Sequence, residues 1–208
     1  MEIKINYQKK LDEIINNLDY TPKLLLHSCC APCSSYCLSY LNDYFNITVL
    51  YYNPNIEPYD EYIKRKKEQI RLIKTMPKTN KIDIIDCDYD NDIYHEKIKG
   101  TEDECEGKAR CSICYYLRLD YTAKKAKELG YEYFGTTLTV SPYKNSEKLN
   151  TIGEKLAKIY NVKFLYSDFK KKNGYKKSIE YSKIYNLYRQ DYCGCIYSKQ
   201  ERENKVNK

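Results

Sequence analysis

Seven of the ten cysteines fall into three close groups, one near the start of the chain, one at the middle and one near the end. The groups are Cys29, Cys30 and Cys33, then Cys111 and Cys114, then Cys193 and Cys195. Thiolates that folding brings together bind soft metals, either zinc or the iron of iron–sulfur clusters. The pattern therefore predicts a metal site built from all three groups.

The number and spacing of these thiols favour an iron–sulfur cluster over one zinc ion. A tetrahedral zinc cannot use all of them, and Cys193-Gly-Cys195 is spaced more tightly than the pairs of zinc ribbons. Cys30-Ala-Pro-Cys33 has the spacing of a redox pair, but the two remote groups argue against that interpretation. A four-cysteine [4Fe–4S] cluster would leave thiols to spare. The spare thiols could hold a second metal or form a redox disulfide.

The remaining cysteines are expected to be structural, and His27 is not expected to be a metal ligand. Cys37, Cys87 and Cys105 stand apart from the three groups, and a buried thiol of this kind behaves as a small apolar side chain. His27 directly precedes the first group in a predicted strand. A core role, or a supporting role beside the metal, is expected for His27 because better ligands surround it.

The composition indicates a protein of the reducing cytoplasm. The chain has 208 residues and a formal charge of +7, from 36 Lys and Arg against 29 Asp and Glu. This excess fits an RNA partner and equally an ordinary surface. The N-terminus is charged and amphipathic rather than signal-like, so reduced cysteines used for metal are expected. No apolar run has membrane-spanning length, and no membrane partner is expected.

Short apolar runs alternate with amphipathic stretches along the chain. The runs of strand length are 23–27, 47–52, 82–86, 133–138 and 162–166. The stretches with helical periodicity are 5–18, 34–41, 59–75, 112–129, 146–160 and 176–186. This order predicts an α/β fold with a mostly parallel, Rossmann-like sheet and helices on both faces, as in HUP (adenine nucleotide alpha hydrolase-like) folds.

The candidate residues follow the predicted strands. The first cysteine group, Asn53-Pro54-Asn55, Cys87-Asp88 and Thr139–Pro142 each come directly after a strand. Ligands of such sheets bind at the carboxyl ends of the strands, so these segments are expected to share one edge. Residues 21–200 are expected to form a single catalytic domain with the iron–sulfur site. Residues 1–20 would be a packing or docking helix, and 201–208 a disordered tail.

Six segments, spread in order from about residue 24 to residue 198, form a further pattern. They are His27-Ser-Cys-Cys-Ala-Pro-Cys33, Tyr51-Tyr-Asn-Pro-Asn-Ile-Glu-Pro58 with Tyr62 and Arg65, Arg110-Cys-Ser-Ile-Cys114, Thr136-Thr-Leu-Thr-Val-Ser-Pro142, Asp168-Phe-Lys-Lys171 and Tyr188-Arg-Gln-Asp-Tyr-Cys-Gly-Cys195. Together they resemble the QueH-type epoxyqueuosine reductases.

The resemblance implies a specific reaction on tRNA. The protein would remove the epoxide oxygen of epoxyqueuosine at the wobble position of tRNAs with GUN anticodons, giving queuosine and water. It would work without cobalamin, using a [4Fe–4S] cluster and an adjacent second, mononuclear metal, expected to be iron. The electron donor stays unknown. The spare thiols would then be ligands of the second metal.

A ligand assignment follows from this resemblance. Cys30, Cys111, Cys114 and Cys195 are assigned to the cluster, and Cys29, Cys33 and Cys193 to the second metal. Adjacent cysteines point in different directions, which favours separating Cys29 from Cys30, but a permuted split stays open. Some family members carry an aspartate at the position of Cys33, which is here either a replacing ligand or a bystander. Asp191, Asp88 or a bound water could supply protons, and Asp191 is taken as the catalytic candidate.

The tRNA contacts are predicted from basic and aromatic residues. The main phosphate contacts proposed are Arg65, Arg110, Lys170, Lys171 and Arg189, with Lys66 and Lys144 as further ones. Tyr52, Tyr143 and Tyr192 could stack on splayed bases. One alternative is an iron–sulfur tRNA-thiolating enzyme, although no Ser-Gly-Gly-x-Asp-Ser loop follows the first strand. The other is a zinc-stabilised RNA-binding module.

Overall fold

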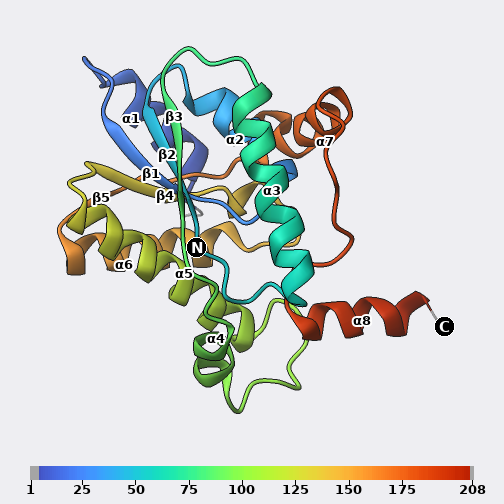
Figure 1. Cartoon of the computed structure of the whole chain (residues 1–208). Helices are drawn as coiled ribbons and strands as arrows, with labels where there is room; N and C mark the ends of the chain where they lie inside the picture. Colours follow the sequence, from blue (N-terminus) through green and yellow to red (C-terminus); the bar gives the residue numbers. More distant parts are fainter. Residues whose placement is uncertain (1–4, 207–208) are drawn as a thin grey trace.

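A five-stranded parallel sheet lies at the centre of the structure, a computed structural model that describes residues 5–206 (Figure 1). Its strands are β1 (Lys23–His27), β2 (Asn46–Tyr51), β3 (Ile82–Asp86), β4 (Tyr133–Thr136) and β5 (Lys163–Phe164). Their order across the sheet is β3-β2-β1-β4-β5, and every neighbouring pair is parallel. The predicted α/β class is confirmed.

Eight α-helices and two short 3-10 turns surround the sheet within the described residues. The helices are α1 (Tyr7–Asn16), α2 (Ala31–Leu41), α3 (Tyr59–Thr75), α4 (Asn91–Ile98), α5 (Ala109–Glu128), α6 (Ser146–Tyr160), α7 (Gly174–Ile184) and α8 (Ile196–Val206). The 3-10 turns are η1 (Leu138–Val140) and η2 (Lys171–Asn173). None of these helices is long and apolar enough to cross a membrane.

The strands β1, β2 and β4 are buried on both faces of the sheet, which explains why they are largely apolar. Leu24 and Leu26 point into a core formed with α1, α2 and α3. Leu25, between them, points to the opposite face and packs with α5 and α6. This alternation follows from the two-residue repeat of a strand. The arrangement matches the prediction of helices on both faces (Figure 1).

The chain reverses its direction of travel across the sheet at β1. It runs outward from β1 through β2 to β3 and then returns to place β4 on the other side of β1. Such a switch point leaves a crevice at the carboxyl ends of the two central strands, where ligands of this fold class bind. The first cysteine group follows β1 directly, so it lies at this crevice.

The C-terminal segment differs from the prediction. A disordered tail was expected over 201–208, but α8 continues to Val206. The helix is held because Tyr197 packs against a small buried cluster and Glu201 pairs with the buried Arg110. The N-terminal helix spans Tyr7–Asn16 and buries Leu11 in the core, while residues 1–4 and 207–208 of the predicted terminal segments lie outside the described part.

Candidate metal and substrate site

Three thiols come together where β1 leads into α2. The sulfurs of Cys29, Cys30 and Cys33 all lie within 4.8 Å of one another, and those of Cys29 and Cys30 are 3.8 Å apart. Cys30 is the N-cap of α2. Hydrogen bonds from Cys29 and Cys33, and the charge of Arg65, hold the pKa of Cys30 well below its usual value. The three thiols can therefore hold a metal jointly.

The other two cysteine groups lie in neighbouring parts of the core. Cys111 and Cys114 are in the first two turns of α5, and Cys195 directly precedes α8. Cys111 shares a buried cluster with Cys29 and Cys30, whereas Cys114 shares one with Cys195, and Leu117 packs against both clusters. Burial raises the pKa of Cys114 to about 12, and the charge of Cys193 adds to this rise. The fold thus gathers groups from the start, middle and end of the chain.

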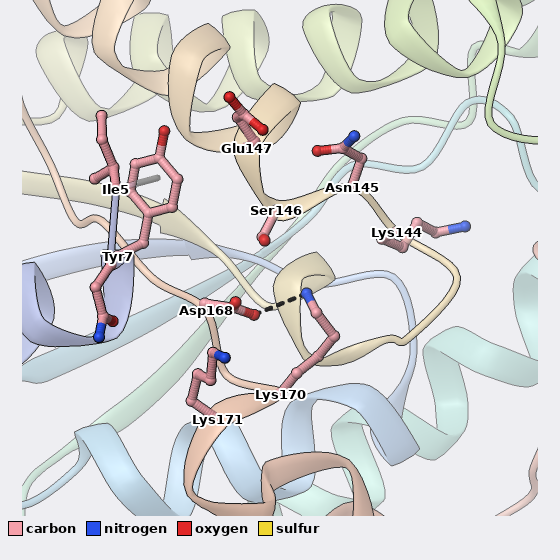
Figure 2. Close-up of a pocket in the computed structure, with 10 residues that line it drawn as sticks. Ile5, Tyr7, Lys144, Asn145, Ser146, Glu147, Asp168, Lys170 and Lys171 are labelled. Carbon is pink, nitrogen blue, oxygen red and sulfur yellow. Dashed lines mark ion pairs between the residues drawn. The ribbon is translucent and has the colours of Figure 1, made fainter. Parts of the chain in front are cut away.

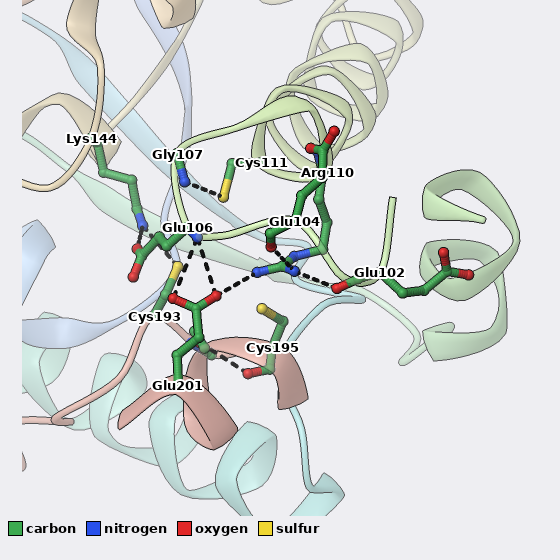
Figure 3. Close-up of polar contacts among 12 residues, drawn as sticks. Glu102, Glu104, Glu106, Gly107, Arg110, Cys111, Lys144, Cys193, Cys195 and Glu201 are labelled. Atoms are coloured by element: carbon green, nitrogen blue, oxygen red, sulfur yellow. Dashed lines mark hydrogen bonds and ion pairs between the residues drawn. The ribbon is translucent and has the colours of Figure 1, made fainter. Parts of the chain in front are cut away.

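Four basic side chains are buried around these thiols. Arg65 donates to the backbone carbonyl of Cys193 at 3.0 Å. Lys144 donates to the sulfur of Cys193 at 2.7 Å (Figure 3). Arg118 donates through Nε to the backbone carbonyl of Cys114 at 3.2 Å. The fourth, Arg110, holds the loop before Cys111. Buried cations are costly without anions, so this environment suits negatively charged metal–thiolate groups.

Polar atoms beside the thiols also fit a bound metal group. The side-chain amide of Gln190 donates to the sulfur of Cys30 at 2.8 Å, while its buried oxygen has no hydrogen-bond partner within the described residues. Donors aimed at thiolate sulfurs are a usual way in which proteins tune iron–sulfur groups. The soft ligands, the buried cations and this amide donor together fit a cluster or a thiolate-bound metal.

A loop that precedes α5 is tied to α8 by a network of hydrogen bonds (Figure 3). The guanidinium of Arg110 donates to the backbone carbonyls of Glu102 and Glu104 and to the carboxylate of Glu201, the last at 3.1 Å. That carboxylate also accepts the backbone N–H of Glu106 at 3.1 Å. Because Cys111 follows Arg110 and Cys195 precedes α8, the network fixes the second and third cysteine groups relative to each other.

A cavity of about 350 Å³ opens beside the thiols. Cys29, Cys33 and Cys193 form part of its wall, together with Asp191 and Gln190. Further wall and rim residues come from the loop after β4, from α7, from the segment between α7 and α8, and from α8, namely Ser141, Tyr143, Lys144, Tyr175, Ser178, Arg189, Arg202 and Lys205. The cavity can admit a group about the size of a modified base and bring it next to three thiols.

The sequence matches the family described as "Epoxyqueuosine reductase QueH" over residues 24–201. Curated relatives with this name include those of Streptococcus pyogenes serotype M1, 43% identical over 200 residues, and Staphylococcus epidermidis, 44% identical over 204 residues. These alignments cover 94% of this chain and 78% and 85% of the two relatives. The chain belongs to the QueH family. The Thermotoga maritima member is 33% identical over 185 residues, covering 88% of this chain and 93% of that protein.

Two of the main phosphate contacts predicted are wrong for this QueH-family chain, and Lys144, predicted as a further contact, is buried as well. The side chains of Arg65 and Arg110 are buried and bonded within the protein, so neither is available to a phosphate. Their positive charges serve the interior, where Arg65 pairs with Glu61 at 2.6 Å. Sequence alone could not separate these arginines from surface ones, because both lie in segments rich in charge.

The other three main phosphate contacts that were predicted lie in two places. Arg189 lines the cavity beside the thiols and donates to the hydroxyl of Ser182 at 2.9 Å. Lys170 and Lys171 line a separate cavity of about 660 Å³ at the start of α6 (Figure 2). Lys170 is paired there with Asp168 at 2.7 Å, whereas Lys171 is exposed.

Several other predictions about single residues can be compared with the structure. His27 is buried, and its Nε2 faces the carbonyl of Tyr52 at 3.1 Å while Nδ1 faces the hydroxyl of Thr136 at 3.1 Å. Burial lowers the pKa of His27 to about 3, so it is a neutral core residue. Tyr52 is itself buried and cannot stack on a base, while Tyr143 is 76% exposed. Asp191 is exposed on the cavity wall.

No disulfide is present among the ten cysteines, all of which lie in the described part of the chain. The sulfurs of Cys29 and Cys30 are 3.8 Å apart, well beyond the S–S bond length of about 2.05 Å. The predicted redox disulfide is therefore not found. Cys37 and Cys87 are buried single thiols, as expected, but Cys105 is exposed.

Sequence reasoning missed three features of the site. Gln190, Arg118 and the basic residues of α8 were not singled out, although all lie at the thiols or the cavity. A signal for Arg118 was present, because it follows Cys114 by four residues and so lies on the same face of α5. No comparable signal marked Arg202 and Lys205, since their segment lacks strong apolar periodicity.

Proposed function

We propose that this chain reduces epoxyqueuosine to queuosine at the wobble position of tRNA. Two electrons and two protons enter, both C–O bonds of the epoxide break, a C=C bond forms and the oxygen leaves as water. The electrons would come from an external low-potential one-electron donor, for which dithionite can substitute in the test tube. The observation that carries the proposal is that Cys29, Cys33 and Cys193 line one cavity of base size.

The ligand sets of the metals are part of this proposal. We assign Cys30, Cys111, Cys114 and Cys195 to a [4Fe–4S] cluster, and Cys29, Cys33 and Cys193 to a second iron. The short distances between the sulfurs of Cys29, Cys30 and Cys33 support metal binding by this group. They fit equally well an assignment in which Cys29 is the cluster ligand and Cys30 binds the second iron. When bound, these metals would deliver electrons singly and polarise the epoxide oxygen, without cobalamin.

The protein side chains would place the substrate and supply protons. The carboxyl groups on the cavity wall are those of Glu106, Asp191 and Glu201, and Asp191 is our candidate donor to the leaving oxygen. The cavity walls would keep the modified base oriented toward the thiols, which favours reaction by holding the reacting groups in place. The reaction would thus use groups from the segment that joins α7 to α8.

The tRNA would dock over the mouth of the cavity. The cavity is too small for more than the modified base, so the wobble nucleotide would have to be turned out of the anticodon stack. Arg189, Arg202 and Lys205 are positioned to meet its phosphates, and the exposed ring of Tyr143 is positioned to stack on a neighbouring base. A tRNA substrate would place the protein in the cytoplasm.

Metal analysis combined with an activity assay tests the proposal against both alternatives. Anaerobically purified protein should contain more iron than one [4Fe–4S] cluster requires and should convert epoxyqueuosine in tRNA when dithionite is added. A colourless zinc protein would instead support the RNA-binding module. An iron protein that requires ATP and adds sulfur to tRNA would support the thiolating enzyme.

A further inference from the structure

Arg118 is the one buried cation of the described residues that has no carboxylate partner. Four Lys and Arg side chains are buried there, and Arg65, Arg110 and Lys144 each form an ion pair with a glutamate. Arg118 is 1% exposed and forms none. Its environment therefore lacks the anion that a buried guanidinium normally requires.

The guanidinium is also incompletely hydrogen-bonded. Its Nε donates to the backbone carbonyl of Cys114 at 3.2 Å, but its buried Nη2 has no hydrogen-bond partner within the described residues. A buried donor left without a partner is costly, and in a native protein it needs an explanation such as an ion that completes the site. Among residues 5–206, its one contact with an aromatic face is to the ring of Tyr115, 5.9 Å from the guanidinium carbon.

Thiolates at the three cysteine groups would supply the missing anion. Burial alone lowers the pKa of Arg118, but thiolate charge on Cys114, Cys29 and Cys193, one cysteine from each group, outweighs this effect and raises it. Arg118 thus lies between the segments that the proposed metals would bridge. A metal–thiolate group carries net negative charge, whereas free thiols at neutral pH are mostly uncharged. The positive charge of Arg118 is matched only when thiolates are present.

We propose that Arg118 is the counter-charge of the metal–thiolate group and sets its reduction potential. The inference rests on the proposed iron cofactors. A fixed positive charge in a medium of low dielectric stabilises the more negative, reduced form, so Arg118 makes the group easier to reduce. Arg118 does not touch the substrate in this role; it is a positioning residue that acts through the thiol site.

The test is a redox titration of iron-loaded protein, followed by its visible and electron paramagnetic resonance spectra. Arg118→Met should make reduction at least about tenfold less favourable, a fall of about 59 mV for a one-electron couple. Arg118→Lys, which keeps the charge, should fall between this variant and the wild type. Arg71→Met is the matched control, because Arg71 is a surface residue paired with Glu68. The reduction potential of the iron in this variant should equal that of the wild type.

Thermal unfolding adds a readout that a purely structural arginine would not give. Without metal, Arg118→Met should unfold at the same or a higher temperature than the wild type, because it removes an unmatched charge. With iron, the same variant should unfold at a lower temperature than the wild type. An equal fall in unfolding temperature with and without iron would overturn the inference.

The outcomes separate this inference from the proposed function. A wild-type protein that binds no iron overturns both. An iron-loaded wild type whose potential is unchanged in Arg118→Met overturns the inference alone. If Arg118→Met takes up no iron, Arg118→Lys decides, since iron binding restored by lysine supports the counter-charge and iron binding lost in both variants contradicts it.

Discussion

The ammonium group of Lys144 lies 2.7 Å from the sulfur of Cys193. The lysine comes from the loop after β4 and the cysteine from the segment before α8, so the contact joins two parts of the chain across the cavity. Lys144 also pairs with Glu106 at 3.2 Å, in the loop that leads to the second cysteine group. The buried ammonium donates a charge-assisted hydrogen bond to this sulfur, so it holds the two segments together at the cavity.

Replacement of Lys144 should therefore impair the reaction without unfolding the protein. Lys144→Gln removes a charge-assisted hydrogen bond worth about 1.5–3 kcal/mol, so we expect about a tenfold to hundredfold lower rate of queuosine formation. Lys158→Gln is the control, since Lys158 is exposed and pairs only with Glu154. A rate within twofold of the wild type for Lys144→Gln would show that the contact is incidental.

Replacement of a cysteine in the first group should remove iron, whereas replacement of its neighbour in α2 should not. Cys30→Ser loses a thiol that lies within 4.8 Å of two others, and iron per protein should fall clearly. Cys37→Ser is the matched control, because Cys37 is buried in α2 one turn after Cys33, and its thiol donates to the carbonyl of Cys33. Equal iron contents in the two variants, measured by elemental analysis, would contradict the assignment.

The contact between Glu201 and Arg110 should stabilise the C-terminal helix. Glu201→Gln leaves the buried guanidinium without its carboxylate, and because Glu201 is partly exposed we expect a loss of about 1–2 kcal/mol in the free energy of unfolding. Urea unfolding of the metal-free protein measures this. Glu154→Gln, at an exposed pair with Lys158, should change stability by no more than about 0.5 kcal/mol.

The basic residues of α8 should contribute to tRNA binding. Arg202→Gln combined with Lys205→Gln should weaken binding of the anticodon stem-loop, and the log–log dependence of affinity on salt should become shallower by about 1.4. Lys155→Gln with Lys158→Gln is the matched control, because both lysines are exposed on α6. Lys158 lies near the amino ends of β4 and β5, at the edge of the sheet opposite the thiols. Fluorescence anisotropy at several salt concentrations separates the two, and identical curves would exclude α8 from the docking surface.

The strands of the sheet could be predicted from the sequence, whereas the structure of the C-terminal segment could not. All five strands were expected, and so were helices close to α2, α3, α5 and α6, because central parallel strands are short apolar runs and the helices between them are amphipathic. The end of the chain was predicted incorrectly. Residues 201–206 form a helix that depends on a distant ion pair with Arg110, and such tertiary support leaves no local signal.

The sequence predicted the site residues correctly where their spacing along the chain showed that they act together. It did not show which charged side chains are buried. The first cysteine group was expected to act together, and its sulfurs do lie close to one another. Arg65 and Arg110 were predicted as surface contacts, yet both are interior cations that, besides local partners, bond to distant segments, Arg65 to the carbonyl of Cys193 and Arg110 to Glu201. An arginine that neutralises a buried site looks like any other in sequence, because its partners are set by the fold.

The most direct test of the account is mass spectrometry of the modified nucleoside after anaerobic reaction with epoxyqueuosine-containing tRNA and dithionite. Iron-loaded protein should yield a nucleoside lighter by one oxygen atom, and the same protein stripped of iron by a chelator should leave epoxyqueuosine unchanged. An unchanged nucleoside with the iron-loaded protein, or a product heavier by one water, would contradict reductive deoxygenation at this thiol site.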